Sequence, residues 1–151
     1  MSRLYVEHLL KNKNRINYGK EMPSQTDTLK SIEQLASLDP NVEVVWLYGS
    51  RARGKASTSS DYDLAIAFTA YIDDPVERRL RPELLALNWA SKLEVELSII
   101  DINQASLPMS YTIVEDNTVL FGKNNYRCMV EEQRIMSKWE LDYCYHGKHY
   151  A

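Results

Sequence analysis

Residues Val42 to Phe68 read VEVVWLYGSRARGKASTSSDYDLAIAF and are the most informative segment of the sequence about the fold. Its first seven residues are β-branched, aliphatic or aromatic apart from one glutamate, and they end at Gly49-Ser50. This pattern predicts a buried strand followed by a turn. The last eight residues, 61–68, alternate between two faces and predict a second strand. The polar residues 51–60 predict a loop or a short helical turn between the strands.

Segments with helical or strand patterns surround this centre and predict a small mixed β-sheet flanked by helices, an α/β (α+β) fold. Helices are expected over residues 24–38, 75–91 and 126 to about 143, and further strands over residues 93–100 and 118–121. Pro82 is expected to confine the regular part of the second helix to the residues after it. The expected inward residues are Leu80, Leu84, Leu85, Leu87 and Trp89 in the second helix, and Tyr126, Met129, Val130, Met136 and Trp139 in the last.

Length and composition indicate one domain over residues 1–151. The chain is 44% hydrophobic and 26% charged, as in a globular protein. We expect a core at about 24–123, a basic N-terminal arm over 1–22, and a C-terminal helix and tail over 124–151.

The same composition excludes several functional classes. No apolar run approaches the roughly 20 residues of a membrane helix, so no membrane association is expected. Two cysteines do not make a disulfide framework, and the N-terminus lacks a secretory pattern, so a cytoplasmic protein with reduced thiols is expected. A net charge of -3 and a pI near 5.6 argue against direct nucleic-acid binding.

Two carboxylates, Asp61 and Asp63, open the second predicted strand. Residues i and i+2 of a strand point to the same face with Cα atoms about 6.6 Å apart. The pair can therefore converge on one hard cation. Mg²⁺ prefers one or two carboxylates together with phosphate oxygens and water, so the pair predicts a site for Mg²⁺ and a nucleoside triphosphate.

The turn before this pair supplies groups that bind phosphate. Gly49 lets the backbone approach a phosphate closely, and the Ser50 hydroxyl can donate to its oxygens. Arg51 and Arg53 can neutralise the triphosphate, and their order in the sequence does not choose between them.

A P-loop is a second interpretation of this turn, because Gly49, Gly54 and Lys55 match G-x-x-x-x-G-K after a predicted strand. A P-loop requires Ser or Thr at the next position to place a hydroxyl on Mg²⁺, and this chain has Ala56. It also requires a helix to follow, whereas residues 56–61 run into a strand. Both departures disfavour the P-loop.

The strand expected over residues 93–100 supplies a third acid. Val95, Leu97 and Ile99 are expected inside, which leaves Glu94 and Glu96 on the opposite face. Either glutamate could complete a two-metal site or accept a proton from an attacking hydroxyl. For Glu94 we favour a solvated strand face.

The pattern Gly49-Ser50-x10-Asp61-x-Asp63, followed by Val95-Glu96-Leu97, resembles the minimal nucleotidyltransferases of the DNA polymerase-β superfamily. More closely, the segments YGSRARG from Tyr48 and SDYDLA from Ser60 resemble the MNT antitoxins, the partners of HEPN-domain toxins. The resemblance covers about residues 24–123. It implies a polymerase-β-like core in which Gly49 and Ser50 bind phosphate, Asp61 and Asp63 bind Mg²⁺, and Glu96 is the third acid. The family most often has Asp at that third position.

The resemblance also implies a function. MNT proteins form hetero-oligomers with a HEPN ribonuclease toxin and neutralise it by transferring AMP from ATP to a toxin tyrosine. The first alternative is a non-catalytic antitoxin that masks the toxin, and the second is an aminoglycoside-type transferase that modifies a small molecule. Outside this core, Cys144, His146 and His149 could ligate zinc, but no fourth ligand is nearby in the sequence, so a frayed tail or a partner-docking strip is favoured.

Overall fold

The computed structural model describes residues 23–150, with side chains as far as Tyr145. The chain divides into two units, residues 1–30 and 31–151, and the sheet lies wholly in the second. The arm predicted over residues 1–22 lies outside the described residues. The helices are α2 (Gln25–Leu38), α3 (Pro75–Leu93), α4 (Leu107–Asp116) and α5 (Asn125–Tyr150), and the strands are β1 (Val42–Tyr48), β2 (Tyr62–Phe68), β3 (Leu97–Asp101) and β4 (Thr118–Gly122).

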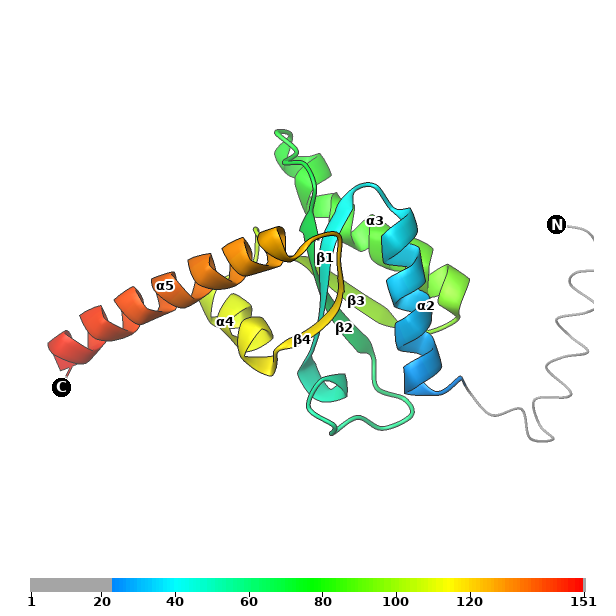
Figure 1. Cartoon of the computed structure of the whole chain (residues 1–151), viewed down its shortest axis with the longest axis horizontal. Helices are drawn as coiled ribbons and strands as arrows, with labels where there is room; N and C mark the ends of the chain where they lie inside the picture. The colour runs from blue at the N-terminus through cyan, green and yellow to red at the C-terminus, as the bar shows by residue number, and fades with distance from the viewer. Residues whose placement is uncertain (1–22, 151) are drawn as a thin grey trace, which may run out of the picture. The chain divides into compact units, whose positions relative to one another are not determined.

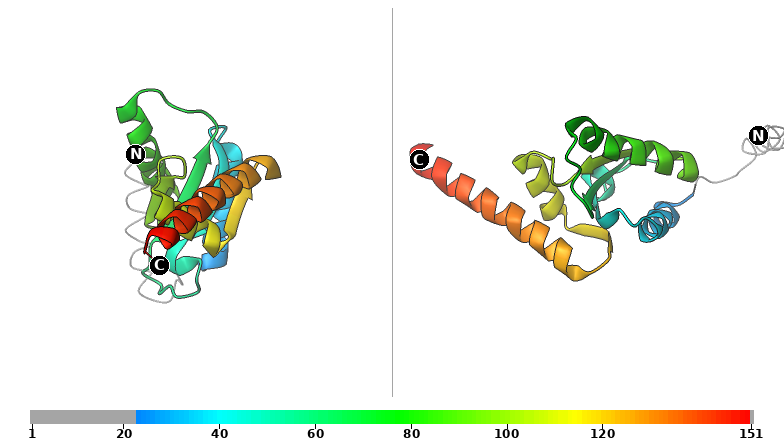
Figure 2. Two further views of the ribbon diagram at one scale, coloured as in Figure 1. Left: turned by 90° about the vertical axis from the view of Figure 1, so that its left-hand side faces the viewer. Right: turned by 90° about the horizontal axis from the view of Figure 1, so that it is seen from above.

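The four strands form one mixed sheet in the order β3-β2-β1-β4. β1 pairs antiparallel with both β2 and β4, whereas β2 pairs in parallel with β3. A parallel pair needs a crossover connection, and α3 provides it. The predicted mixed sheet flanked by helices is confirmed. Within the second unit, α3 lies on one side of the sheet and α4 and α5 lie on the other (Figures 1 and 2).

The two central strands are buried on both faces. Trp46 and Ala65 belong to a cluster with Ile113 of α4 and Ile135 of α5. Residues of the opposite parity, such as Leu64, are equally buried beneath the other face. The near-continuous apolar sequences of β1 and β2 have this cause, because a strand covered on both sides has no solvated face.

Helix α3 differs from its prediction in extent. It runs without interruption from Pro75 to Leu93, so the expectation that Pro82 would confine the regular part was wrong. The Asp74 side chain caps the first turn by accepting hydrogen bonds from two backbone N–H groups, and Pro75 fits the first helical position. Pro82 itself is buried, and this packing offsets the hydrogen bond that a helical proline loses.

The predicted inward faces of two helices were also partly wrong. In α3, Leu84 and Leu87 are 61% and 70% exposed, and Trp89 is the buried residue of the predicted set. In α5, Tyr126, Met129 and Val130 are exposed, whereas Ile135 and Glu131 are buried. The two remaining residues of the predicted set, Met136 and Trp139, are half-buried, and Trp139 stacks on Tyr111 of α4. Apolar residues lie on several sides of these helices, so periodicity alone did not define the covered side.

Strand β3 begins four residues later than predicted. Leu93 ends α3, and Glu94 adopts a left-handed conformation with φ 55° that caps the helix. The chain needs this reversal before it can join the sheet, so β3 runs from Leu97 to Asp101. Glu94 therefore lies in the helix cap, and Glu96 immediately precedes the strand.

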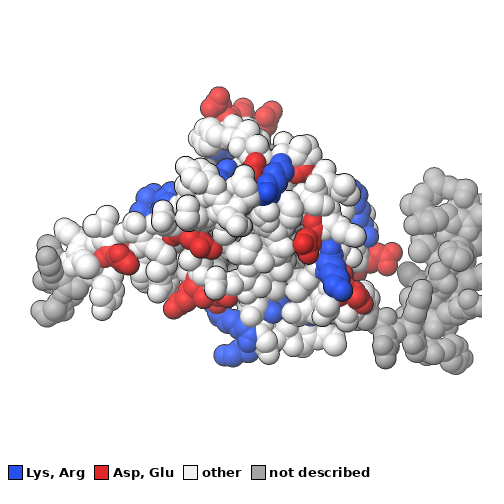
Figure 3. Space-filling view, viewed as in Figure 1, with Lys and Arg blue, Asp and Glu red and all other residues white. Residues whose placement is uncertain are grey.

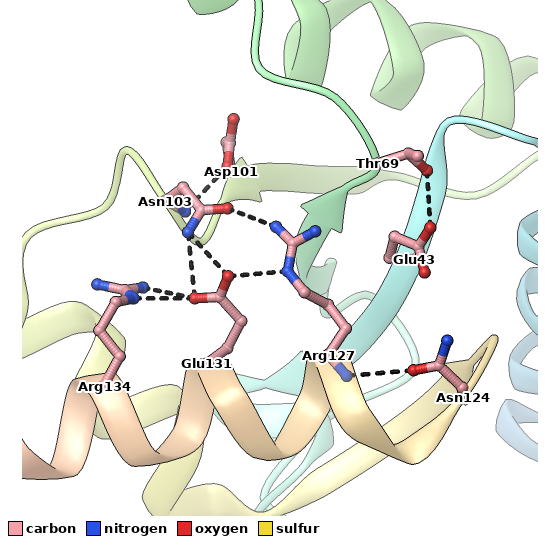
Figure 4. A network of polar contacts seen from close by, with 8 residues as sticks. All are labelled: Glu43, Thr69, Asp101, Asn103, Asn124, Arg127, Glu131 and Arg134. Atoms are coloured by element: carbon pink, nitrogen blue, oxygen red, sulfur yellow. Dashed lines mark hydrogen bonds and ion pairs between the residues drawn. The ribbon is translucent and has the colours of Figure 1, made fainter.

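A buried carboxylate fastens α5 to the loop after β3 (Figure 4). Glu131 accepts hydrogen bonds from the Asn103 side chain, from Arg127 Nε at 2.9 Å and from Arg134 Nη2 at 2.8 Å. Burial acts to raise the pKa of Glu131, but these hydrogen bonds outweigh it and hold the pKa below its ordinary value. The network fixes the helix against the loop that leads into α4.

Charged side chains of both signs are interspersed on the face drawn in Figure 3, and the described residues form no continuous basic patch there. Among the described residues, no helix has the length and apolar character needed to cross a lipid bilayer.

Candidate active site

The predicted site residues meet at one end of the sheet. Because β1 is antiparallel to β2 and β4, its C-terminal end lies beside the N-terminal ends of those strands. β3 is parallel to β2, so its start lies at the same end, and the Tyr62 N–H donates to the Glu96 carbonyl at 3.0 Å. The turn after Tyr48 and the acids at 61, 63 and 96 are therefore assembled by strand pairing alone.

Gly49 permits the close packing of this end. It opens a 3₁₀ turn, Gly49–Arg51, with φ +74°. A Cβ placed on Gly49 would lie 2.5 Å from Oδ2 of Asp63, which is closer than real contacts allow. The Asp63 carboxylate thus lies directly over the Gly49 backbone. Ser50 lies half-buried in the same turn.

The three predicted acids form an electrostatically coupled group. Burial, and then the charge of Asp61, raise the pKa of Asp63. A hydrogen bond with Asp61, together with its charge, raises the pKa of Glu96. Burial and the charge of Asp63 also raise the pKa of Tyr48 to about 12, so this phenol stays neutral beside the acids. The charge of Asp61 is therefore a cause of the raised pKa of both Asp63 and Glu96.

This group fits a hard cation as paired carboxylates. None of the ion pairs among the described side chains involves Asp61, Asp63 or Glu96. No three acidic, His or Cys side chains of the described part of the chain form a cluster able to hold a metal by themselves. Two carboxylates suffice for Mg²⁺ where phosphate and water oxygens complete the coordination shell. The charge of Asp61 raises the pKa of Asp63 and of Glu96, so a positive charge bound here would be favourable.

Arg51 holds the loop that separates the turn from β2. Its Nε and Nη2 donate to the Ser60 carbonyl at 3.2 and 2.8 Å, and its guanidinium lies 4.2 Å from the centre of the Tyr62 ring. These contacts fix the residues that lead into Asp61. The predicted phosphate-binding role of Arg51 stays a prediction.

Arg53 contacts a residue that the sequence analysis did not identify, Asp116 at the end of α4. Arg53 Nε donates to Asp116 Oδ1 at 3.1 Å, and the Gly49 N–H donates to Asp116 Oδ2 at 3.2 Å. The helix itself was not predicted. Ser106 at its N-cap, Pro108 in its first turn and Asn117 after its end were the available signals.

A groove of about 650 Å³ adjoins the acids at the edge of the sheet. Asp61 and Glu96 lie along it, and Leu87, Ala90 and Leu97 provide apolar walls. A flat, partly apolar group can therefore reach the carboxylates from the side of α3 and β3.

Comparisons with known proteins agree with this arrangement. The sequence pattern of the family "Polymerase beta, Nucleotidyltransferase" matches residues 30–126. The protein adenylyltransferase MntA of Shewanella oneidensis is 26% identical over 98 residues, which are 65% of this chain and 67% of that protein.

Two solved structures share the fold. A toxin–antitoxin crystal structure with AMP-PNP superposes with a TM-score of 0.63 at 20% identity, covering 80% of this chain and 93% of the other. A tri-AMPylated Shewanella oneidensis HEPN toxin in complex with an MNT antitoxin gives a TM-score of 0.60 at 18% identity, covering 83% and 94%. At these identities the likeness is one of fold. The family pattern spans more than half of the sequence and includes the turn and all three acids, and the chain belongs to the polymerase-β nucleotidyltransferase family.

Proposed function

We propose that this protein is an antitoxin that transfers AMP from ATP to a tyrosine hydroxyl of a partner HEPN-domain ribonuclease toxin and thereby neutralises it. The observation that carries the proposal is the placing of Asp61, Asp63 and Glu96 beside the Gly49 turn at one end of the sheet. The similarity to a protein named as an adenylyltransferase, and to complexes of MNT antitoxins with HEPN toxins, supports the choice of donor and acceptor. ATP as the donor suits a cytoplasmic protein.

The chemistry is an in-line displacement at the α-phosphorus of ATP. The tyrosine oxygen forms the new P–O bond, the bond to pyrophosphate breaks, and the phenolic proton leaves the tyrosine. Glu96 at the groove is our candidate acceptor for that proton. Gly49, Ser50 and Arg53 would bind the phosphates, while Arg51 holds the loop that orients Asp61.

Mg²⁺ is the cofactor that this donor set suits. Asp61 and Asp63 would hold it, with Glu96 as the third acid. When bound, Mg²⁺ offsets the negative charge that develops on the entering and leaving oxygens.

The acceptor would approach along the groove between α3 and β3. Its apolar walls suit the ring of a tyrosine, and Asp61 and Glu96 lie where the hydroxyl would arrive. The groove is open to solvent, so a tyrosine that projects from the surface of a folded partner could enter it.

The test is the intact mass of the cognate HEPN partner after incubation with this protein, ATP and Mg²⁺. We expect mass increments of one or more AMP groups, and none with the Asp61→Asn/Asp63→Asn variant. This variant preserves side-chain volume and removes both charges, so retained folding can be checked by circular dichroism. An increment at the wild-type rate with the variant would refute the assignment of these acids.

Two other outcomes point to the alternatives. Tight complex formation and neutralisation without ATP, and without a mass increment, would identify a masking antitoxin. Modification of an aminoglycoside by the purified protein alone would identify a small-molecule transferase.

A further inference from the structure

Asp116 contacts both the amide of the turn and an arginine of the site. It ends α4, and its side chain is 10% exposed. Oδ2 accepts from the Gly49 N–H, and Oδ1 accepts from Arg53 Nε. These two donors belong to the residues expected to hold the triphosphate, yet Asp116 comes from an element far along the chain.

The backbone around Asp116 is itself fixed. Asn117 adopts a left-handed conformation with φ 49°, and its N–H donates to the Val114 carbonyl to close the helix. The Thr118 hydroxyl donates to the Asp116 carbonyl at 3.1 Å as β4 begins. The carboxylate is therefore held between a helix end and a strand start, which makes it a stable anchor.

Asp116 contacts Arg53 in a way that leaves the two terminal nitrogens of its guanidinium available to bind a ligand. The contact uses Nε, and no hydrogen bond from the two terminal nitrogens is found among the described residues. The Arg53 side chain is 48% exposed. An arginine binds a phosphate best through two parallel N–H groups, and both terminal nitrogens can still provide them.

Arg51 shows the opposite arrangement. Its Nη2 donates to the Ser60 carbonyl at 2.8 Å and to the Thr58 carbonyl at 3.4 Å. The loop therefore occupies a terminal nitrogen of Arg51, whereas Asp116 occupies only Nε of Arg53. The structure thus distinguishes two arginines that the sequence leaves equivalent.

We propose that Asp116 is a positioning residue for the nucleotide: it anchors the Gly49 turn and orients Arg53 so that the terminal nitrogens of Arg53 bind the ATP triphosphate. This inference rests on the proposed nucleotidyl transfer and adds a residue to it. Asp116 orients groups that bind ATP and does not itself contact the reacting atoms. Its loss should therefore weaken ATP binding more than it slows turnover.

The experiment measures the ATP dissociation constant by calorimetry, together with KM and kcat for AMP transfer. Asp116→Ala should raise both the dissociation constant and KM about tenfold while kcat changes less than about twofold. Asp116→Asn keeps the side-chain shape but has one acceptor oxygen, so it should fall between wild type and alanine. Glu115→Ala removes the same charge from the adjacent exposed position and should leave both constants unchanged.

Arg53→Ala then tests whether Asp116 acts through Arg53. In the Arg53→Ala background, Asp116→Ala should cost less than about threefold, because the group that it orients is gone. Fully additive costs would overturn the inference. If Asp116→Ala binds ATP as tightly as wild type does, the inference is also overturned. Tighter binding by Asp116→Ala would overturn it too, by showing that the carboxylate competes with the phosphates.

Failure of the proposed function is distinguishable from failure of this inference. Wild-type protein that binds ATP but transfers no AMP overturns the function, while the dissociation constants still decide the role of Asp116. Wild-type protein that does not bind ATP overturns both. If Asp116→Ala does not fold, as judged by its thermal midpoint, Asp116→Asn carries the same comparison.

Discussion

Gly49 and Gly54 both have positive φ values, +74° and +70°, but a Cβ would meet different surroundings at the two positions. At Gly49 it would lie 2.5 Å from the Asp63 carboxylate, whereas at Gly54 no atom lies within 4 Å. Replacing Gly54 would therefore cause backbone strain alone, whereas replacing Gly49 would add a collision with Asp63. Gly49 was predicted to approach a phosphate, and the structure adds its contact with an acid.

Gly49→Ala should reduce AMP transfer at least tenfold and lower the unfolding free energy by about 1–3 kcal/mol, because strain and displacement of Asp63 combine. Gly54→Ala is the matched control and should cost about 1 kcal/mol from strain, with transfer little changed. Urea unfolding and the partner mass assay measure the two effects. Equal losses of activity in both variants would contradict the packing argument.

At the scale of elements, the helices show where periodicity is a sufficient guide and where it is not. The existence of α3 and α5 was predicted from apolar spacing, but the covered side of α5 centres on Ile135 and a buried glutamate. A charged residue inside is explained by the hydrogen bonds that Glu131 accepts from Arg127, Arg134 and Asn103. Arg127 lies one turn before Glu131 in α5, Arg134 lies one turn after it, and Asn103 lies in the loop after β3.

The Glu131 network should make stability depend on pH. Because the folded pKa of Glu131 lies below its ordinary value of 4.5, its contribution is complete well above that value and is lost as pH falls through the folded pKa. Glu131→Gln should lower the unfolding free energy by about 2 kcal/mol at pH 7, and the difference from wild type should shrink toward pH 3. Urea unfolding across this range measures it.

Glu140→Gln on the exposed part of the same helix provides the control and should follow wild type at every pH. A constant difference between wild type and Glu131→Gln from pH 7 to pH 3 would show that packing, and not the charge of Glu131, supports the helix.

At the scale of the whole molecule, charge bears on the choice of partner. The net charge is -3, and basic side chains on the face in Figure 3 alternate with acidic ones. A nucleic-acid-binding surface depends on clustered lysine and arginine that release counterions from phosphates. The overall electrostatics therefore favour a protein partner.

A fluorescently labelled oligonucleotide should accordingly show no saturable binding to this protein at 0.15 M salt, the approximate physiological ionic strength. Fluorescence anisotropy measures this, with a basic DNA-binding domain as the positive control. Saturable binding that persists at this salt concentration would show that a local basic surface outweighs the net charge.

The strand–turn–strand centre, with Gly49, Asp61 and Asp63 at its turn and second strand, could be predicted from the sequence alone. These features depend on local properties, namely β-branched residues, glycine freedom and the two-residue period of a strand. Pairing of β2 with β3 then brought Glu96 to the same end, although the strand began later than predicted because Glu94 caps α3.

The contacts that this centre receives from distant parts of the chain could not be predicted and depend on how the chain packs. Asp116 reaches the Gly49 N–H across 67 positions, and no local pattern marks such a contact. The difference between Arg51 and Arg53 likewise depends on which carbonyl or carboxylate lies nearby. Strands can be predicted from neighbouring residues, but the partner of a buried or charged side chain is set by how helices pack on the sheet, and that packing depends on the whole chain.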